Sequence, residues 1–181
     1  MKDTALIVTD VQESFRHRPY WSDADVPEFV RNLQSLIDGC AAREVPIVQI
    51  FHTEDDGAFA PASGWVKTLD PVTIAPDVVI HKRYHSALVG TPLAAWLTER
   101  GIRRVIVCGI RTEQCCETTA RHASDSGFEV DYVTDATLTF PMTHSRSGRT
   151  FSSAELKERT ELVLSDRFAR IATVEEALAK V

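Results

Sequence analysis

The sequence lacks any segment suited to crossing a membrane or to export. Its apolar runs, such as 5–8 and 105–108, are far shorter than the roughly 20 residues that a membrane-spanning helix needs. The first residues, Met1-Lys2-Asp3, lead straight into an apolar run and do not have the layout of a signal peptide. We therefore expect a cytoplasmic protein that has no membrane among its partners.

Clustered positive charge is lacking as well. The chain of 181 residues carries a formal net charge of −6, and its one locally basic stretch, 145–149, has the composition of a solvated loop. Binding to nucleic acid requires basic side chains gathered against the phosphates. The sequence therefore excludes nucleic acid as the main partner.

Cysteine is scarce and is not spaced for disulfides or metal. There are four cysteines, of which Cys115 and Cys116 are adjacent, and no CxxC spacing occurs. His52 with Asp55 or Asp56 has the ligand types of a zinc site, but no second histidine follows nearby. We predict a chain with no disulfide framework, no metal and no other cofactor.

What the sequence does contain is an alternation of strand-like and helix-like segments. The strand-like segments are 4–9, 46–51, 78–81, 103–108, 129–134 and 169–172, and the helix-like segments are 26–43, 92–100, 113–126 and those that follow Ser152 and Thr173. Such alternation is typical of a parallel sheet with helices on both faces. We predict one α/β domain over residues 1–181, with a doubly wound, mostly parallel, six-stranded sheet.

Several residues mark helix starts, and two segments stand out as long loops. Ser152-x-x-Glu155 and Thr173-x-x-Glu176 are capping boxes, Asp25 is the expected N-cap of the first helix, and Thr91-Pro92 supplies an N-cap followed by proline at the first helical position. The segments 52–76 and 136–151 have no regular period. Loops of this length inside a compact domain usually serve function.

Three chemically distinct side chains are expected at one edge of this sheet. Asp10 follows the first strand, Lys82 follows the third, and Cys115 lies just beyond the fourth. Ligands bind outside the carboxyl ends of the strands in such sheets. Cys115 also falls in the first turn of a helix, where the helix dipole and Lys82 favour a thiolate, and Asp10 is placed to accept the thiol proton. The group predicts nucleophilic catalysis.

Three longer motifs surround these residues. They are Asp10-Val11-Gln12-Glu13-Ser14-Phe15, Lys82-Arg83-Tyr84-His85-Ser86-Ala87, and the run from Gly109 to Ala120, which reads GIRTEQCCETTA. In this order and spacing the chain resembles the isochorismatase-like cysteine hydrolases over nearly its whole length. The resemblance implies hydrolysis of a carbon–nitrogen bond, in an amide or ureide of a small molecule, through a Cys115 thioester.

The resemblance also implies a role for each of the central residues. Cys115 is the expected nucleophile, Asp10 the general base and acid, and Lys82 the group that lowers the thiol pKa. A cis peptide bond is expected between Ile110 and Arg111, with the backbone N–H groups of Arg111 and Cys115 forming the oxyanion hole. Relatives of this type are commonly oligomeric, which implies a homodimer or homotetramer.

The substrate pocket is less well defined by the sequence. Arg111 stands where relatives commonly have a small residue, so it either binds a substrate carboxylate or points to solvent or a neighbouring subunit. The side chains expected on loops at the carboxyl edge, and therefore the candidates for substrate binding, are Phe15, Trp65, Tyr84, Arg111 and Phe140.

Two other functions remain open at this stage. The first is isochorismatase-type hydrolysis of a vinyl ether, which in this family needs the aspartate and not the cysteine. The second is a non-catalytic small-molecule-binding or redox-sensing module on the same fold. The complete motif around Cys115 weighs against the first, and the absence of a glycine-rich phosphate loop after the first strand weighs against a nucleotide-binding version of the second.

Overall fold

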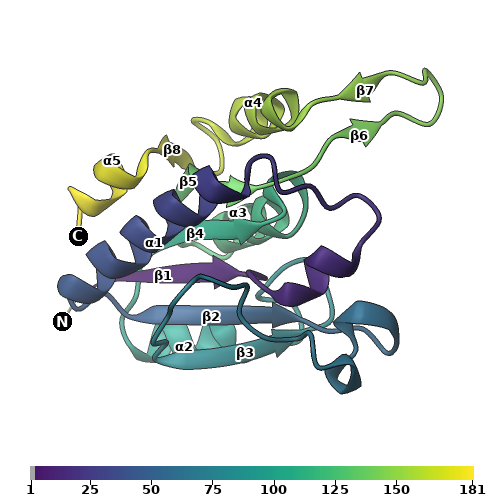
Figure 1. Ribbon diagram of the computed structural model, residues 1–181. Helices are drawn as coiled ribbons and strands as arrows, with labels where there is room; N and C mark the ends of the chain where they lie inside the picture. The colour runs from purple at the N-terminus through teal and green to yellow at the C-terminus, as the bar shows by residue number, and fades with distance from the viewer. Residues whose placement is uncertain (1–2) are drawn as a thin grey trace.

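The fold, seen in a computed structural model that describes residues 3–181, is a sheet between two helical layers (Figure 1). The sheet has six strands in the order β3-β2-β1-β4-β5-β8, and every neighbouring pair is parallel. Its strands are β1 (Thr4–Thr9), β2 (Ile47–His52), β3 (Val78–Lys82), β4 (Arg104–Ile110), β5 (Glu129–Leu138) and β8 (Arg170–Ala172). The predicted six-stranded α/β fold is confirmed.

The helices cover the two faces of the sheet unequally. They are α1 (Val26–Ala42), α2 (Leu93–Glu99), α3 (Glu117–Asp125), α4 (Ser153–Leu164) and α5 (Val174–Leu178). Buried side chains of α1 and α5 belong to one hydrophobic cluster, and those of α2, α3 and α4 belong to the other. The sheet is therefore sandwiched between two separate apolar cores.

The central strands show why the sheet is doubly covered. In β1 the side chains of Leu6 and Val8 belong to the α1 cluster, whereas Ala5 and Ile7 belong to the α2 cluster. Alternate residues of a strand point to opposite faces, so an unbroken apolar run is buried on both sides. This rigid centre holds the carboxyl ends of β1, β2, β3 and β4 together.

Some element boundaries differ from the expectations. Asp25 precedes α1 but makes no side-chain cap, because its backbone is already helical. Pro92 is the N-cap of α2 and not its first residue. Strand β5 runs on to Leu138, and a short hairpin, β6 (Met142–Thr143) with β7 (Thr150–Phe151), stands in the expected loop and projects from the domain.

Other local predictions are confirmed. The side chains of Ser152 and Thr173 each cap their helix, and Glu155 and Glu176 complete both capping boxes. Between residues 3 and 181, no helix is both long enough and apolar enough to cross a membrane.

Candidate active site

Asp10 directly follows β1, in a turn with a strained backbone conformation. Its backbone has a φ of 51°, in the left-handed region that residues other than glycine seldom adopt. The backbone N–H of Asp10 donates to Ile50 O at 3.0 Å, which ties the turn to the neighbouring strand. Such outliers persist where the surrounding structure holds them, and they cluster at functional sites. The turn buries the Asp10 side chain completely.

Gln12 fixes the strand ends on either side of this turn. Its Oε1 accepts from the backbone N–H of His52 at 2.8 Å, and its Nε2 donates to His52 O at 3.1 Å and to Ser14 Oγ at 2.8 Å. A buried amide with both ends bonded holds its partners in one geometry. The glutamine of the first motif therefore sets the spacing between the ends of β1 and β2.

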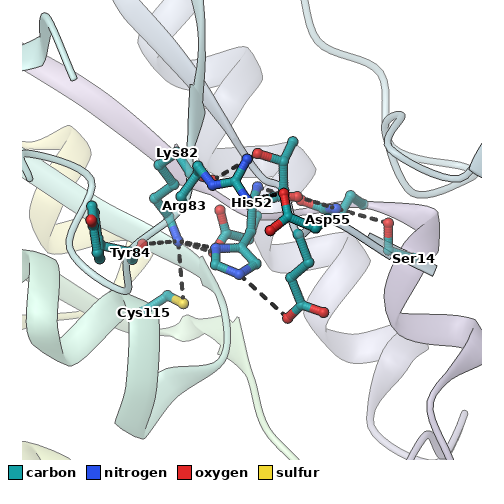
Figure 2. Close-up of polar contacts among 11 residues, drawn as sticks. Ser14, His52, Asp55, Lys82, Arg83, Tyr84 and Cys115 are labelled. Atoms are coloured by element: carbon teal, nitrogen blue, oxygen red, sulfur yellow. Dashed lines mark hydrogen bonds and ion pairs between the residues drawn. The ribbon is translucent and has the colours of Figure 1, made fainter. Parts of the chain in front are cut away.

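Lys82 is the centre of the site, as Figure 2 shows. Its Nζ lies 2.8 Å from Asp10 Oδ2, 3.4 Å from Cys115 Sγ, 3.2 Å from His52 Nδ1 and 3.0 Å from Tyr84 O. The Lys82 backbone carbonyl accepts from the Thr53 N–H at 2.8 Å, which fixes the strand end. The structure therefore brings Asp10, Lys82 and Cys115 together from three strand ends, deep in the protein.

The end of β4 delivers Cys115 through an unusual turn. Gly109 has a φ of 121°, and a Cβ there would lie 2.0 Å from Thr9 O, so only glycine allows β1 and β4 to approach this closely. The predicted cis bond between Ile110 and Arg111 is present. The next turn, Thr112–Cys116, is a π-helical turn in which the Cys116 N–H donates to Arg111 O, and α3 follows it. The helix begins later than predicted.

The protonation of the site differs from the expectation. Burial raises the pKa of the Cys115 thiol, Asp10 raises it further, and the opposing effect of Lys82 is smaller. Lys82 does lower the pKa of the Cys115 thiol, as expected, but burial and Asp10 outweigh its effect, and the sequence does not reveal how little solvent reaches the sulfur. Burial also raises the pKa of Asp10 against the opposing effect of Lys82, which makes this carboxylate a stronger base.

His52 is a neutral partner of Lys82. Burial, with Lys82 nearby, lowers the pKa of His52 to about 4. Because Nδ1 faces the Lys82 ammonium, Nδ1 is the acceptor and the ring proton sits on Nε2, which lies 3.6 Å from Glu54 Oε1. Asp55, one of the two carboxylates with the ligand type of a zinc site, pairs with Arg83. Within residues 3–181, no three His, Cys, Asp or Glu side chains form a cluster suited to metal.

Arg111 points inward and is already paired. Its side chain is buried, and Nη2 lies 3.0 Å from Glu113 Oε1, which is buried as well. The guanidinium carbon lies 4.7 Å from the ring centre of Tyr20 and 5.7 Å from that of Phe140, and Nη2 donates to Phe140 O at 3.4 Å. Of the two orientations that the sequence leaves open for the Arg111 side chain, the structure therefore has the inward one.

A small pocket opens onto the sulfur. Its volume is about 270 Å³, and its lining is Asp10, Phe15, Arg18, Tyr20, His52, Glu54, Phe59, His85, Arg111, Gln114 and Cys115. Phe15 and Phe59 meet edge to face, with ring centres 5.0 Å apart. Pockets of this size suit a small molecule.

Two of the five substrate-binding candidates line this pocket, and three do not. Phe15 and Arg111 line it, but Trp65 and Tyr84 do not: Trp65 packs on His17 with ring centres 4.1 Å apart, and the Tyr84 side chain is largely exposed. Tyr84 contributes only its backbone carbonyl, to Lys82. Phe140 is buried behind the pocket, against Tyr20 and Arg111.

Most of the other residues that line the pocket were not predicted from the sequence. Arg18 and Tyr20 lie in the irregular stretch between β1 and α1, where no periodicity indicates which side chains turn inward. His52 was not among the predicted substrate-binding residues, although its place at the end of β2 puts it at the same edge as Asp10. That position was the signal that could have identified it.

Comparison with known proteins agrees with this geometry. The isochorismatase domain profile matches residues 4–176. The chain is 26% identical over 177 residues to the uncharacterized isochorismatase family protein YrdC of Bacillus subtilis, covering 96% of this chain and 94% of YrdC. It is 32% identical over 155 residues to Nicotinamidase 3 of Arabidopsis thaliana, covering 77% and 75%.

A solved structure gives the same result. A protein from Burkholderia xenovorans, provisionally assigned as an isochorismatase, superposes with a TM-score of 0.88 at 33% identity, covering 98% of this chain and 86% of that one. The sequence profile, the relatives and the fold thus converge on one assignment, which the sequence motifs had already indicated. The chain belongs to the isochorismatase family and is a hydrolase of that family.

Proposed function

We propose that this protein hydrolyses a carbon–nitrogen bond, in an amide or ureide of a small molecule, through a thioester on Cys115. The observation that carries the proposal is the contact of one buried ammonium, Lys82 Nζ, with both the Asp10 carboxylate at 2.8 Å and the Cys115 sulfur at 3.4 Å. The relative named Nicotinamidase 3 supports an amide as the reacting group.

The first half of the reaction forms the thioester. The Cys115 thiol gives its proton to the Asp10 carboxylate while the sulfur attacks the carbonyl carbon of the substrate. The carbonyl oxygen becomes an oxyanion, which the backbone N–H groups of Arg111 and Cys115 stabilise. The intermediate collapses with cleavage of the carbon–nitrogen bond, and the leaving nitrogen takes the proton from Asp10. Lys82 stabilises the negative charge as it moves among these groups.

The second half releases the product. A water molecule attacks the thioester carbon and gives a proton to Asp10. The second tetrahedral intermediate then expels the sulfur, which recovers the proton from Asp10 as a thiol. The raised pKa of Asp10 suits both steps, because a carboxylate that binds a proton more firmly is the stronger base, and its acid form remains able to protonate an amine.

Cys115→Ala is the decisive variant, and Cys116→Ala is its matched control. The first removes the nucleophile, so turnover of amide substrates should fall by about 10⁴-fold or more. The second removes a neighbouring buried thiol outside the pocket and should leave turnover nearly as it was. Intact mass spectrometry of the wild-type protein, quenched during turnover, should show the acyl adduct on Cys115.

The same experiment separates the alternatives. Vinyl-ether hydrolysis through Asp10 alone would survive Cys115→Ala and would also survive alkylation of the thiol. A non-catalytic module would bind small amides without turnover in either protein. Full amide turnover by the Cys115→Ala protein would refute the thioester route.

A further inference from the structure

Arg18 carries the one guanidinium of the pocket lining that has no carboxylate partner in the part of the chain that the structure describes. Arg18 lines the pocket together with Cys115, and its side chain takes part in no ion pair and no hydrogen bond among residues 3–181. The neighbouring Arg16, by contrast, pairs with Glu13 at 3.3 Å and with Asp23 at 3.5 Å. The two arginines therefore differ in whether their charge is neutralised.

Apart from His85, which also lines the pocket, the other basic side chains that line or underlie it are compensated or neutral. Lys82 pairs with Asp10, Arg111 pairs with Glu113, and His52 is neutral. Glu54 is the one acidic side chain of the lining besides Asp10, and its carboxylate lies toward the His52 ring, 3.6 Å from Nε2. An anion that entered this pocket would find one unpaired guanidinium, on Arg18.

Aromatic rings position that guanidinium at the pocket wall. The guanidinium carbon of Arg18 lies 5.8 Å from the ring centre of Tyr20 and 5.8 Å from that of Phe59, and both rings line the same pocket. Contact with ring faces orients a guanidinium and leaves its N–H groups, which lie in the guanidinium plane, free for a carboxylate. Arg18 is thus an exposed residue at the pocket wall whose guanidinium contacts these rings without being neutralised.

From these contacts we infer that Arg18 is a specificity-determining residue that binds a carboxylate of the substrate, so that the preferred substrate is a short amide or ureide bearing an acidic group. The inference rests on the proposed function for the position of the reacting bond at Cys115. The pocket volume of about 270 Å³ equals the space of roughly nine water molecules, which limits the substrate to a short chain. Arg111 forms the wall and is not the anion receptor, because Glu113 already neutralises it.

Three short amides test the charge preference. Succinamate carries a carboxylate at the end distant from the amide, succinamide carries a neutral amide there, and β-alaninamide carries an ammonium. In the wild-type protein kcat/KM should be highest for succinamate. Arg18→Gln should lower the succinamate-to-succinamide ratio of kcat/KM by about 10-fold, mainly through KM, since a hydrogen bond to a charged group is lost. Arg16→Gln is the matched control and should keep the ratio.

A second measurement does not depend on turnover. Iodoacetate and iodoacetamide are similar in size and differ in charge, and both alkylate a cysteine thiol. Arg18→Gln should lower the ratio of their alkylation rates at Cys115, iodoacetate over iodoacetamide, by about 3-fold or more. Cys40, Cys108 and Cys116 are fully buried, so intact mass spectrometry after short exposure reports on the pocket thiol.

The outcomes separate the two proposals. No turnover of any probe, with the alkylation ratio lowered by Arg18→Gln, would count against the amidase function and support Arg18 as an anion site. Unchanged ratios in both measurements would overturn the role of Arg18 whatever the substrate proves to be. A preference for β-alaninamide would also overturn it, by showing that Glu54 dominates recognition.

Discussion

The site contains two buried ion pairs, Lys82 with Asp10 and Arg111 with Glu113. They differ in which other atoms the cation contacts. Lys82 pairs with Asp10 and also reaches the Cys115 sulfur and the His52 ring. Arg111 pairs with Glu113, and its remaining contacts are a backbone carbonyl and aromatic rings. Under the proposed function only the Lys82–Asp10 pair takes part in the reaction, and it is called the reactive pair below.

The two pairs also differ in how they are positioned. Asp10 and Lys82 come from the ends of two strands that are 72 residues apart in the chain and are joined through β2 in the sheet. Arg111 and Glu113 come from one turn, two residues apart. Removing one partner of either pair leaves a buried charge, which costs about 3–5 kcal/mol, but only the first loss should also stop the chemistry. The following variants test this distinction.

Lys82→Met should give the largest effect on the reactive pair. Turnover should fall by about 10²–10⁴-fold, the usual contribution of a positioned acid–base partner. Without the ammonium, the pKa of the Cys115 thiol should rise further, so iodoacetamide should alkylate Cys115 more slowly and only at higher pH. The pH dependence of the alkylation rate is the measurement. A variant that keeps the wild-type alkylation profile would show that Lys82 does not act on the sulfur.

Arg111→Met should act on stability and not on chemistry. Leaving Glu113 buried and unpaired should lower the free energy of unfolding by about 3–5 kcal/mol, measured by urea denaturation. The double variant Arg111→Met with Glu113→Gln removes both charges and keeps an acceptor for the Thr139 hydroxyl. It should recover most of that loss. A double variant no more stable than the single one would mean that the aromatic contacts of Arg111, and not its charge, support the fold.

The reactive pair was predictable because sheet topology decides it. Parallel strands carry their carboxyl ends to one edge, so Asp10, Lys82 and Cys115 could be placed together from the order of apolar runs alone. The roles given to them came from the resemblance, and the catalytic assignment stays a proposal.

The packing around Arg111 was not predictable, since it depends on contacts among irregular segments. Tyr20 and Arg18 precede α1 and have no periodicity, and Trp65 was equally plausible from sequence but packs on His17. The predicted direction of the pKa shift of the Cys115 thiol was wrong for a related reason. A cation beside the sulfur can be inferred from topology, whereas the degree of burial that outweighs it cannot.

His52 gives the reactive side a dependence on pH. Its pKa is about 4 in the folded protein and about 6.5 in the unfolded chain. Between these values the unfolded chain binds the proton and the folded protein does not, so acidification from pH 6.5 to pH 4 should destabilise the fold, by on the order of 2 kcal/mol. His52→Gln should flatten this slope, and His144→Gln, on the exposed β6–β7 hairpin, should not. An equal slope in the His52→Gln protein would show that other groups cause the acid sensitivity.

The smallest expected effect concerns substrate charge on the Arg111 side. An inward Arg111 with a free guanidinium would favour acidic substrates, and its loss would weaken them about 10- to 100-fold more than neutral ones. The ion pair with Glu113 changes that expectation, because the net charge of the pair is close to zero before any substrate enters. The double variant Arg111→Met with Glu113→Gln should therefore lower kcat/KM for succinamate and for succinamide by the same factor, about 3-fold or less, since the backbone N–H of residue 111 stays in place. Comparing both substrates in the double variant and in Arg18→Gln assigns charge recognition to one arginine. A loss confined to succinamate in the double variant would move that role from Arg18 to Arg111.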